Sequence, residues 1–145
     1  EYLTHFALWA IMGSPLIMGC DLRKASEETK KTLLNKDLIA INQDLEARGA
    51  YVIKPLPDAY NENEAFILVK PLADGDLAIG IFNFSDTQRE LSLEFWDMGI
   101  PYAAGVSLAL HDCITGEELG EFTERFAPVV PSHGCVVVRA RIVEK

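Results

Sequence analysis

Asp21 is the carboxylate whose place in the sequence best suits chemistry. It follows residues 16–18, a continuous apolar run typical of a strand buried on both faces of a parallel sheet. α/β barrels carry functional groups at that end of a strand, and two carboxylates about 5 Å apart suit retaining cleavage of a glycosidic bond. The neighbouring Arg23 favours another interpretation, a local pair with Asp21 at the turn. No second carboxylate has a comparable setting, and Asp44 better fits a helix end or a domain junction.

The histidines do not predict a nucleophile and its base. His111 stands beside Asp112 at the end of a predicted strand, an arrangement that could supply a base and its orienting acid. The nearby Cys113, however, lacks the sharp turn that presents a nucleophile. His5 falls on the first predicted helix and His133 in a turn before the last strand, so both favour structural roles.

Aromatic side chains could form a surface on which sugars stack. Those in the β part stand at alternating strand positions, where aromatic residues are more typical of a core. We therefore favour a core role for most of this set, which comprises Trp9, Phe82, Phe84, Phe95 and Trp96.

The sequence predicts neither a cofactor nor a metal. It contains no P-loop, G-x-G-x-x-G, EF-hand loop or H-E-x-x-H motif. The acidic residues of the polar stretch 58–64 are typical of a solvated loop rather than of ligands, and they are Asp58, Glu62 and Glu64. No two cysteines have C-x-x-C spacing, so we expect free thiols at Cys20, Cys113 and Cys135.

Composition limits the kinds of partner. The 145 residues are 49% hydrophobic and 24% charged, which is typical of a folded globular chain. Their net charge of −9 repels phosphate backbones and anionic lipid, so nucleic acid and membrane surfaces are not expected partners. The apolar stretch 6–20 is interrupted by glycine and proline and is shorter than the ~20 residues that a membrane span requires.

The first third of the chain predicts a helix, a strand and further helices. Thr4 could cap a helix that continues to Met12 and is apolar almost all the way round, and the sequence Gly-Ser-Pro at 13–15 ends it. Ser26 predicts the start of a second helix, and Asp37 could cap a further helical turn.

From about Gly49 the pattern becomes that of an all-β domain. The sequence Asp-Gly-Asp at 74–76 is a hairpin turn signal, and residues 91–95 show the clearest alternation of apolar and polar side chains. The expected strands are joined by short turns, which indicates an antiparallel sandwich, and they cover 51–54, 65–69, 77–84, 91–95, 106–110, 122–126 and 135–142.

The two parts do not predict a single domain. A helix that is apolar all round needs neighbours on every side, and a parallel strand needs a sheet, which the sandwich alone cannot supply. We therefore expect residues 1–45 to be the end of a larger α/β domain whose remainder lies upstream, and residues 46–145 to be the sandwich.

Several motifs carry a family resemblance. Residues 5–12, 15–18 and 21–23 together resemble the end of the catalytic barrel of glycoside hydrolase family 27, the α-galactosidases and α-N-acetylgalactosaminidases. Residues 36–44 are similar to the segment that closes this barrel, although Leu-Glu at 45–46 replaces the family's usual proline and glycine.

The β part carries the resemblance further. Residues 77–86 resemble the signature strand of the family's C-terminal sandwich, and residues 131–134 resemble its final turn. The resemblance implies a (β/α)8 barrel followed by a β-sandwich, with residues 16–18 as the eighth barrel strand. This fold class is an α/β remnant followed by an all-β antiparallel sandwich.

The resemblance also implies a function for the parent protein. It would be a retaining α-galactosidase, with a nucleophilic and an acid–base aspartate on earlier barrel strands. No position in this chain matches those aspartates or the family's substrate-binding motif, so no catalytic residue is assigned. The chain alone is then expected to be inactive and structural, with the upstream barrel as its partner, an α-galactoside substrate reached through the parent, and a role in contacts between copies of the parent.

Two other interpretations stay open. The sandwich could be a free-standing carbohydrate-binding module that uses its aromatic side chains. The parent could also be a related hydrolase, such as an α-N-acetylgalactosaminidase or a β-arabinopyranosidase, because substrate specificity lies in the loops at the strand ends of the barrel.

Overall fold

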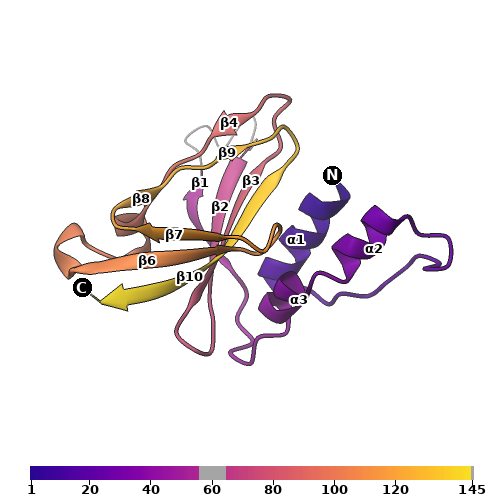
Figure 1. Cartoon of the computed structure of the whole chain (residues 1–145), viewed down its shortest axis with the longest axis horizontal. Coiled ribbons are helices and arrows are strands. Elements are labelled where there is room, and N and C mark those ends of the chain that lie inside the picture. The colour runs from indigo at the N-terminus through magenta and orange to yellow at the C-terminus, as the bar shows by residue number, and fades with distance from the viewer. Residues whose placement is uncertain (56–64, 145) are drawn as a thin grey trace.

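The computed structural model describes residues 1–55 and 65–144, and it consists of three short helices followed by a β-sandwich (Figure 1). The helices are α1 (Tyr2–Met12), α2 (Glu27–Leu33) and α3 (Lys36–Asn42). The predicted order, a helical part followed by an antiparallel sandwich, is confirmed.

The ends of the helices follow from capping residues. Gly13 ends α1 in the left-handed conformation, with φ of 72°, which glycine adopts without strain. Ser26 begins α2 as predicted, because its side chain accepts a hydrogen bond from the Thr29 amide. Asn35 caps α3 in the same way through the amide of Leu38.

Two capping predictions were wrong. Thr4 lies inside α1, where its hydroxyl donates to the His133 carbonyl oxygen at 2.8 Å and so ties the helix to the last turn of the sandwich. Asp37 lies in the first turn of α3, and the cap belongs to Asn35. In both cases a polar side chain two or three residues away from the helix start was assigned to the start itself.

Six strands form one fully antiparallel sheet in the order β1-β2-β3-β10-β6-β7. The Asp-Gly-Asp turn joins β2 and β3 as predicted. The last strand of the chain, β10, lies in the middle of the sheet. The strands are β1 (Tyr51–Pro55), β2 (Ala65–Pro71), β3 (Leu77–Asn83), β6 (Val106–Asp112), β7 (Glu118–Phe122) and β10 (Cys135–Glu144).

A second, irregular layer covers one face of the sheet. Here β4 (Arg89–Glu90) pairs with β9 (Val129–Val130), and β5 (Leu93–Glu94) pairs with β8 (Arg125–Phe126). Bonds between Leu91 N and Pro128 O and between Phe95 N and Glu124 O continue this ribbon. The 3-10 helices η1 (Phe95–Met98) and η2 (Tyr102–Ala104) follow β5.

The ribbon corrects two predicted strands. Residues 91–95 bury their apolar side chains as the alternation requires, but only two of these residues form a strand. Residues 122–126 contain the last residue of β7 and the whole of β8. Alternation therefore identified the buried face correctly, whereas the length of each ladder depends on a partner strand that is itself irregular.

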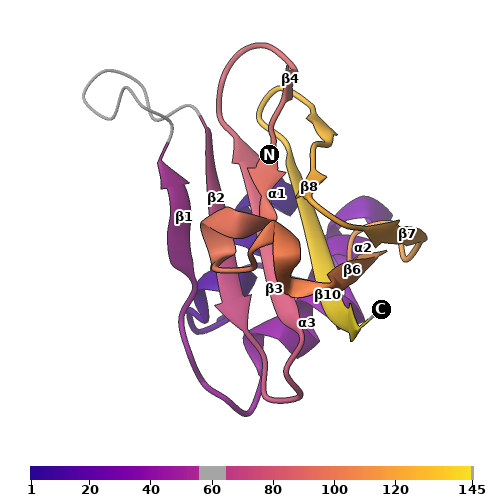
Figure 2. The same cartoon turned by 90° about the vertical axis from the view of Figure 1, so that its left-hand side faces the viewer.

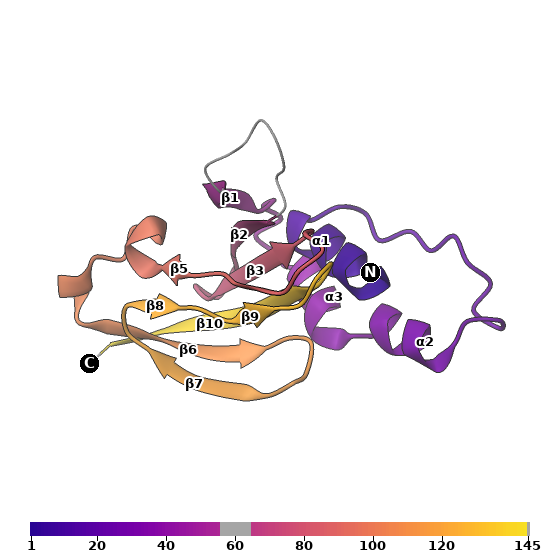
Figure 3. The same cartoon turned by 90° about the horizontal axis from the view of Figure 1, so that it is seen from above.

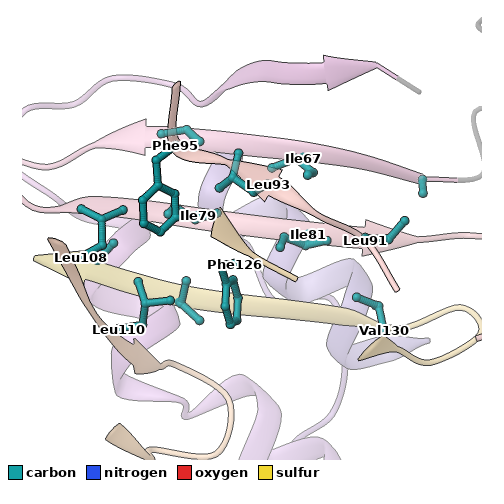
Figure 4. Close-up of a cluster of buried hydrophobic side chains, with 14 residues drawn as sticks. Ile67, Ile79, Ile81, Leu91, Leu93, Phe95, Leu108, Leu110, Phe126 and Val130 are labelled. Carbon is teal, nitrogen blue, oxygen red and sulfur yellow. The ribbon is translucent and has the colours of Figure 1, made fainter. Parts of the chain in front are cut away.

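Apolar side chains between the sheet and the ribbon form the sandwich core (Figure 4). Each central strand contributes alternate residues, such as Ile79 and Ile81 of β3 and Leu108 and Leu110 of β6. The ribbon contributes Leu91, Leu93, Phe95, Phe126 and Val130. This is the arrangement expected of a two-layer antiparallel fold.

The helices cover the opposite face of the sheet. Figure 2 shows the ribbon in front of the sheet and the helices behind it. Apolar residues of α1 and α3, namely Ala7, Ala10, Ile11, Leu38 and Ile41, pack in one cluster with Leu68, Ala78, Phe82 and Val137 of the sheet. The sandwich therefore covers one side of α1, a contact that the sequence analysis did not identify, because the sheet is apolar on both faces.

The predicted strand at 16–18 does not form in the described structure. These residues belong to the connection between α1 and α2, which swings away from the sandwich (Figure 3). Ile17 is 87% exposed. A parallel strand needs a neighbouring strand for its backbone hydrogen bonds. None of the described sheets extends to residues 16–18, so no strand forms there.

α1 packs closely against β3 at Gly80. A Cβ atom at this position would lie 2.6 Å from Phe82 Cε2 and 2.9 Å from Ile11 Cδ1. Glycine is therefore required here because the side chains of Phe82 and Ile11 leave no room for a Cβ atom, and not because of the backbone conformation.

A buried lysine lies under the end of α3. Lys70 of β2 is fully buried, and its Nζ donates a hydrogen bond to the carbonyl oxygen of Ile41. Burial lowers the pKa of this ammonium, and the negative charge of Asp44 opposes part of that change. Cations stabilise helix C-termini, where the backbone carbonyls carry partial negative charge.

Replacing Gly80 by valine should destabilise the fold. The branched side chain collides with Phe82 and Ile11, and overpacking of this kind typically costs about 1–3 kcal/mol. Urea denaturation followed by circular dichroism measures the loss. Gly19→Val is the matched control, because no atom lies within 4 Å of a Cβ at that position. Equal stability of the two variants would contradict the close packing of α1 on β3.

Replacing Lys70 by methionine should also destabilise the fold, by about 1–3 kcal/mol, because the Ile41 carbonyl loses its buried donor. Lys31→Met, on the exposed side of α2, removes the same charge and should change stability by less than about 0.5 kcal/mol. Urea denaturation compares the two variants.

The pH dependence of the Lys70→Met effect has a defined sign. The pKa of Lys70 is lower in the folded state than its usual 10.5, so the unfolded chain binds more protons between these two values. The stability advantage of wild type over Lys70→Met should therefore grow as pH rises through that window. An advantage that shrinks there would show that burial does not lower the pKa of Lys70.

Candidate functional site

The carboxylate of Asp21 is engaged by Arg23. Its Oδ1 accepts from the Arg23 backbone N at 3.1 Å and from Nε at 2.9 Å, and its Oδ2 accepts from the second guanidinium nitrogen at 3.0 Å. These bonds hold the pKa of Asp21 below its usual value. A carboxylate so stabilised in its charged form is a poor general acid. Asp21 and Arg23 thus form the local pair that the sequence analysis favoured.

Asp44 joins the helical segment to the sandwich. Its Oδ1 accepts from the backbone N of Ala73, in the turn between β2 and β3, and from that of Glu46, both at 3.0 Å. This is the junction role that its sequence position suggested. The sequence analysis did not identify Lys70, although a lysine within the apolar segment 65–71 is an unusual feature that could have drawn attention to it.

His111 does not pair with its sequence neighbour. Its Nδ1 lies 2.7 Å from Glu118 Oε1, and its Nε2 lies 3.3 Å from Asp37 Oδ2. Asp112 instead accepts hydrogen bonds from the backbone of the turn that follows β6. Burial raises the pKa of the Cys113 thiol to about 12, so this thiol stays protonated at neutral pH. These groups do not form a nucleophile with its base.

The other two histidines have structural surroundings. His133 has a left-handed backbone, with φ of 50°, and its Nε2 lies 3.0 Å from Asp86 Oδ1. The His5 ring packs edge-on against Trp9 with ring centroids 5.6 Å apart. All three cysteines are free thiols, as predicted.

The candidate aromatic residues do not meet on one surface. Trp9 belongs to α1 on the helical side of the sheet, whereas Trp96 belongs to η1, next to the sandwich core. Phe82 and Phe95 are buried in different clusters. Phe84 is 37% exposed and packs near Phe82. A flat platform for a sugar ring is therefore not assembled from this set.

Within residues 1–55 and 65–144, no group of three or more histidine, cysteine, aspartate or glutamate side chains could hold a metal ion. Asp58, Glu62 and Glu64 lie outside the described residues. In the same described part of the chain, no helix has the length and apolar character needed to cross a membrane.

Several large apolar side chains of the helical segment are exposed. Trp9, Ile17 and Leu34, for example, are 44%, 87% and 68% exposed. We call these residues together the exposed apolar face, and they are Tyr2, Trp9, Met12, Ile17, Met18, Leu22, Leu34 and Leu45. Where exposed apolar side chains form a large patch, they mark a site on which another protein surface packs.

Comparisons with known proteins agree with the two-part organisation. Residues 1–44 match the family described as alpha galactosidase A, and residues 62–140 match the alpha galactosidase C-terminal beta sandwich domain. The chain is 35% identical over 141 residues to a probable alpha-galactosidase of Dictyostelium discoideum, which covers 95% of this chain and 35% of that protein.

Solved structures show the same fold. Alpha-galactosidase I from Mortierella vinacea superposes with a TM-score of 0.82 at 25% identity, covering 96% of this chain and 34% of that one. A family 27 β-L-arabinopyranosidase from Geobacillus stearothermophilus superposes with a TM-score of 0.79 at 26% identity, covering 94% and 29%.

The chain thus spans about a third of the length of these relatives. Its two matched regions follow each other without overlap, and the second covers more than half of the chain. The chain belongs to glycoside hydrolase family 27, and it corresponds to the C-terminal region of the family's α-galactosidases.

Proposed function

We propose that the chain is the structural C-terminal part of a retaining α-galactosidase that removes terminal α-D-galactosyl residues. The exposed apolar face of the helical segment carries this proposal, because it needs a covering protein surface and the candidate carboxylates of the chain serve local structure. The upstream barrel of the same protein is the partner that fits this face. Catalytic aspartates and the galactoside site then belong to that barrel.

The proposed domain organisation follows from the two sides of the helices. Residues 1–45 belong to the barrel and residues 46–145 form the sandwich. One side of α1 packs on the sheet through Ala7, Ala10 and Ile11, while Trp9 and Met12 point away from it. The helical segment therefore forms the surface of the barrel on which the sandwich packs, and it fixes the position of the sandwich relative to the barrel.

A carbohydrate-binding module is the less favoured function. Such a module needs aromatic rings presented together on its surface, and here the two tryptophans stand on opposite sides of the sheet. Titration of the 145-residue chain with galactose and raffinose by calorimetry should give no saturable heat. Saturable binding would favour the module.

The isolated chain should not hydrolyse p-nitrophenyl α-galactoside. Its one candidate carboxylate after residues 16–18, Asp21, is bound by Arg23 rather than set beside a second acid as a catalytic pair requires. Release of p-nitrophenol, measured beside a buffer blank on protein shown to be folded, checks this. Turnover that Asp21→Asn abolishes would make Asp21 catalytic, and turnover that survives it would place catalysis elsewhere in this chain.

Without a barrel, the exposed apolar face should make the chain self-associate. Sedimentation velocity should show association that grows with concentration, and the triple variant Ile17→Glu, Met18→Glu, Leu34→Glu should be monomeric. The matched control carries three glutamates on exposed apolar positions of the sandwich, Val52, Val129 and Ile142, and should still associate. A monomeric wild type, or association lost only in the control, would contradict the proposed role of the helical face.

A further inference from the structure

Both ring nitrogens of His111 face carboxylates that come from different parts of the fold. Glu118 stands opposite His111 on the neighbouring strand β7, with Oε1 2.7 Å from Nδ1. Asp37 belongs to the first turn of α3, with Oδ2 3.3 Å from Nε2. A neutral imidazole has a single N–H and can donate to one acceptor, whereas the imidazolium ion donates to both. The geometry therefore fits the protonated ring.

The remaining charged groups around His111 are engaged elsewhere or face solvent. Arg139 of β10 is the other cross-strand neighbour of His111, but its guanidinium binds two carboxylates of the β2–β3 turn, Asp74 and Asp76. Asp112 accepts from the backbone after β6, and Lys36 at the start of α3 is exposed. The charge on His111 is therefore governed by Glu118 and Asp37.

We propose that His111 forms a pH-sensitive contact that holds the helical segment against the sandwich. In its protonated form it holds α3 against the β6–β7 hairpin, and loss of its proton as pH rises loosens this end of the helix. A second contact at the same place does not titrate, because the Asn35 side-chain amide donates to the Cys113 carbonyl oxygen at 2.8 Å. The change is therefore a loosening of α3 and not its release.

The two carboxylates have separate roles. Hydrogen bonding to Glu118 is the largest influence on the pKa of His111 and raises it, burial of the ring lowers it by a smaller amount, and hydrogen bonding to Asp37 raises it further. Glu118 belongs to the sandwich and keeps its contact when α3 lifts, so it raises the pKa in both states and sets the pH of the change. Asp37 makes its contact only when α3 is docked, so this contact couples the proton to docking, and any burial of the ring that α3 adds opposes part of the coupling.

The sign follows from linkage. In this proposal the contact with Asp37 raises the pKa of His111 on docking by more than the added burial lowers it, so protonation stabilises docking. This stabilisation is complete below the undocked pKa and is lost as pH rises through the docked pKa. The equilibrium constant for lifting α3 rises roughly tenfold for each unit of pKa difference between the two states.

Hydrogen exchange of the 145-residue chain tests the proposal. Protection factors of the α3 amides, corrected for the intrinsic pH dependence of exchange and referenced to β3, should fall between about pH 5.5 and pH 8.5, on either side of an ordinary histidine pKa. His111→Gln and Asp37→Asn should each remove this pH dependence. Glu118→Gln should keep it and move its midpoint to lower pH.

His133→Gln is the matched control, because His133 also faces a carboxylate but lies at the other end of the helical interface. It should leave the pH dependence of α3 unchanged. Protection of α3 that is independent of pH in wild type, or a dependence that His133→Gln removes, would overturn the proposal. So would nitrogen NMR shifts showing an unprotonated ring nitrogen in His111 at pH 5.5.

Discussion

The ammonium group of Lys70 is the point on which the helical face of the molecule depends. It is buried beneath the helices, where it serves the last turn of α3 through Ile41 and lies near Gly13 at the end of α1. Two helix ends with partial negative charge thus meet one buried cation. Because an unpaired charge in an apolar layer is costly, this contact favours a position of α3 in which the Ile41 carbonyl oxygen lies against Lys70.

Much of this fold could be read from local patterns in the sequence. Alternating side chains identified the buried apolar residues of segments 91–95 and 106–110, and the Asp-Gly-Asp turn at 74–76 identified the hairpin of β2 and β3. Period and turn chemistry do not reveal what covers the second face of a sheet, so the packing of α1 on β3 was missed. Residues 16–18 show that a sequence pattern does not reveal neighbouring elements, because an apolar run forms a strand only where another strand lies beside it.

The candidate site divides along similar lines. The Asp21–Arg23 pair joins residues two apart in the chain and could be predicted from their types. The partners of His111 could not, because neighbours along a strand point to opposite faces, which separates His111 from Asp112. Asp37 lies 74 residues away from it in sequence and reaches it only through the tertiary fold. Short-range chemistry was therefore predictable, and the contacts that join the two parts of the chain were not.

The central position of β10 has a consequence for biosynthesis. Among the described strands, β10 leaves the ribosome after all the others, yet β10 joins β3 to β6 and supplies Val137 to the layer beneath the helices. Until that strand emerges, the nascent chain holds two unconnected halves of a sheet, β1-β2-β3 and β6-β7, each with an open edge. A premature stop codon before Cys135 would remove the strand that joins these halves, so it should produce a protein that quality-control proteases remove.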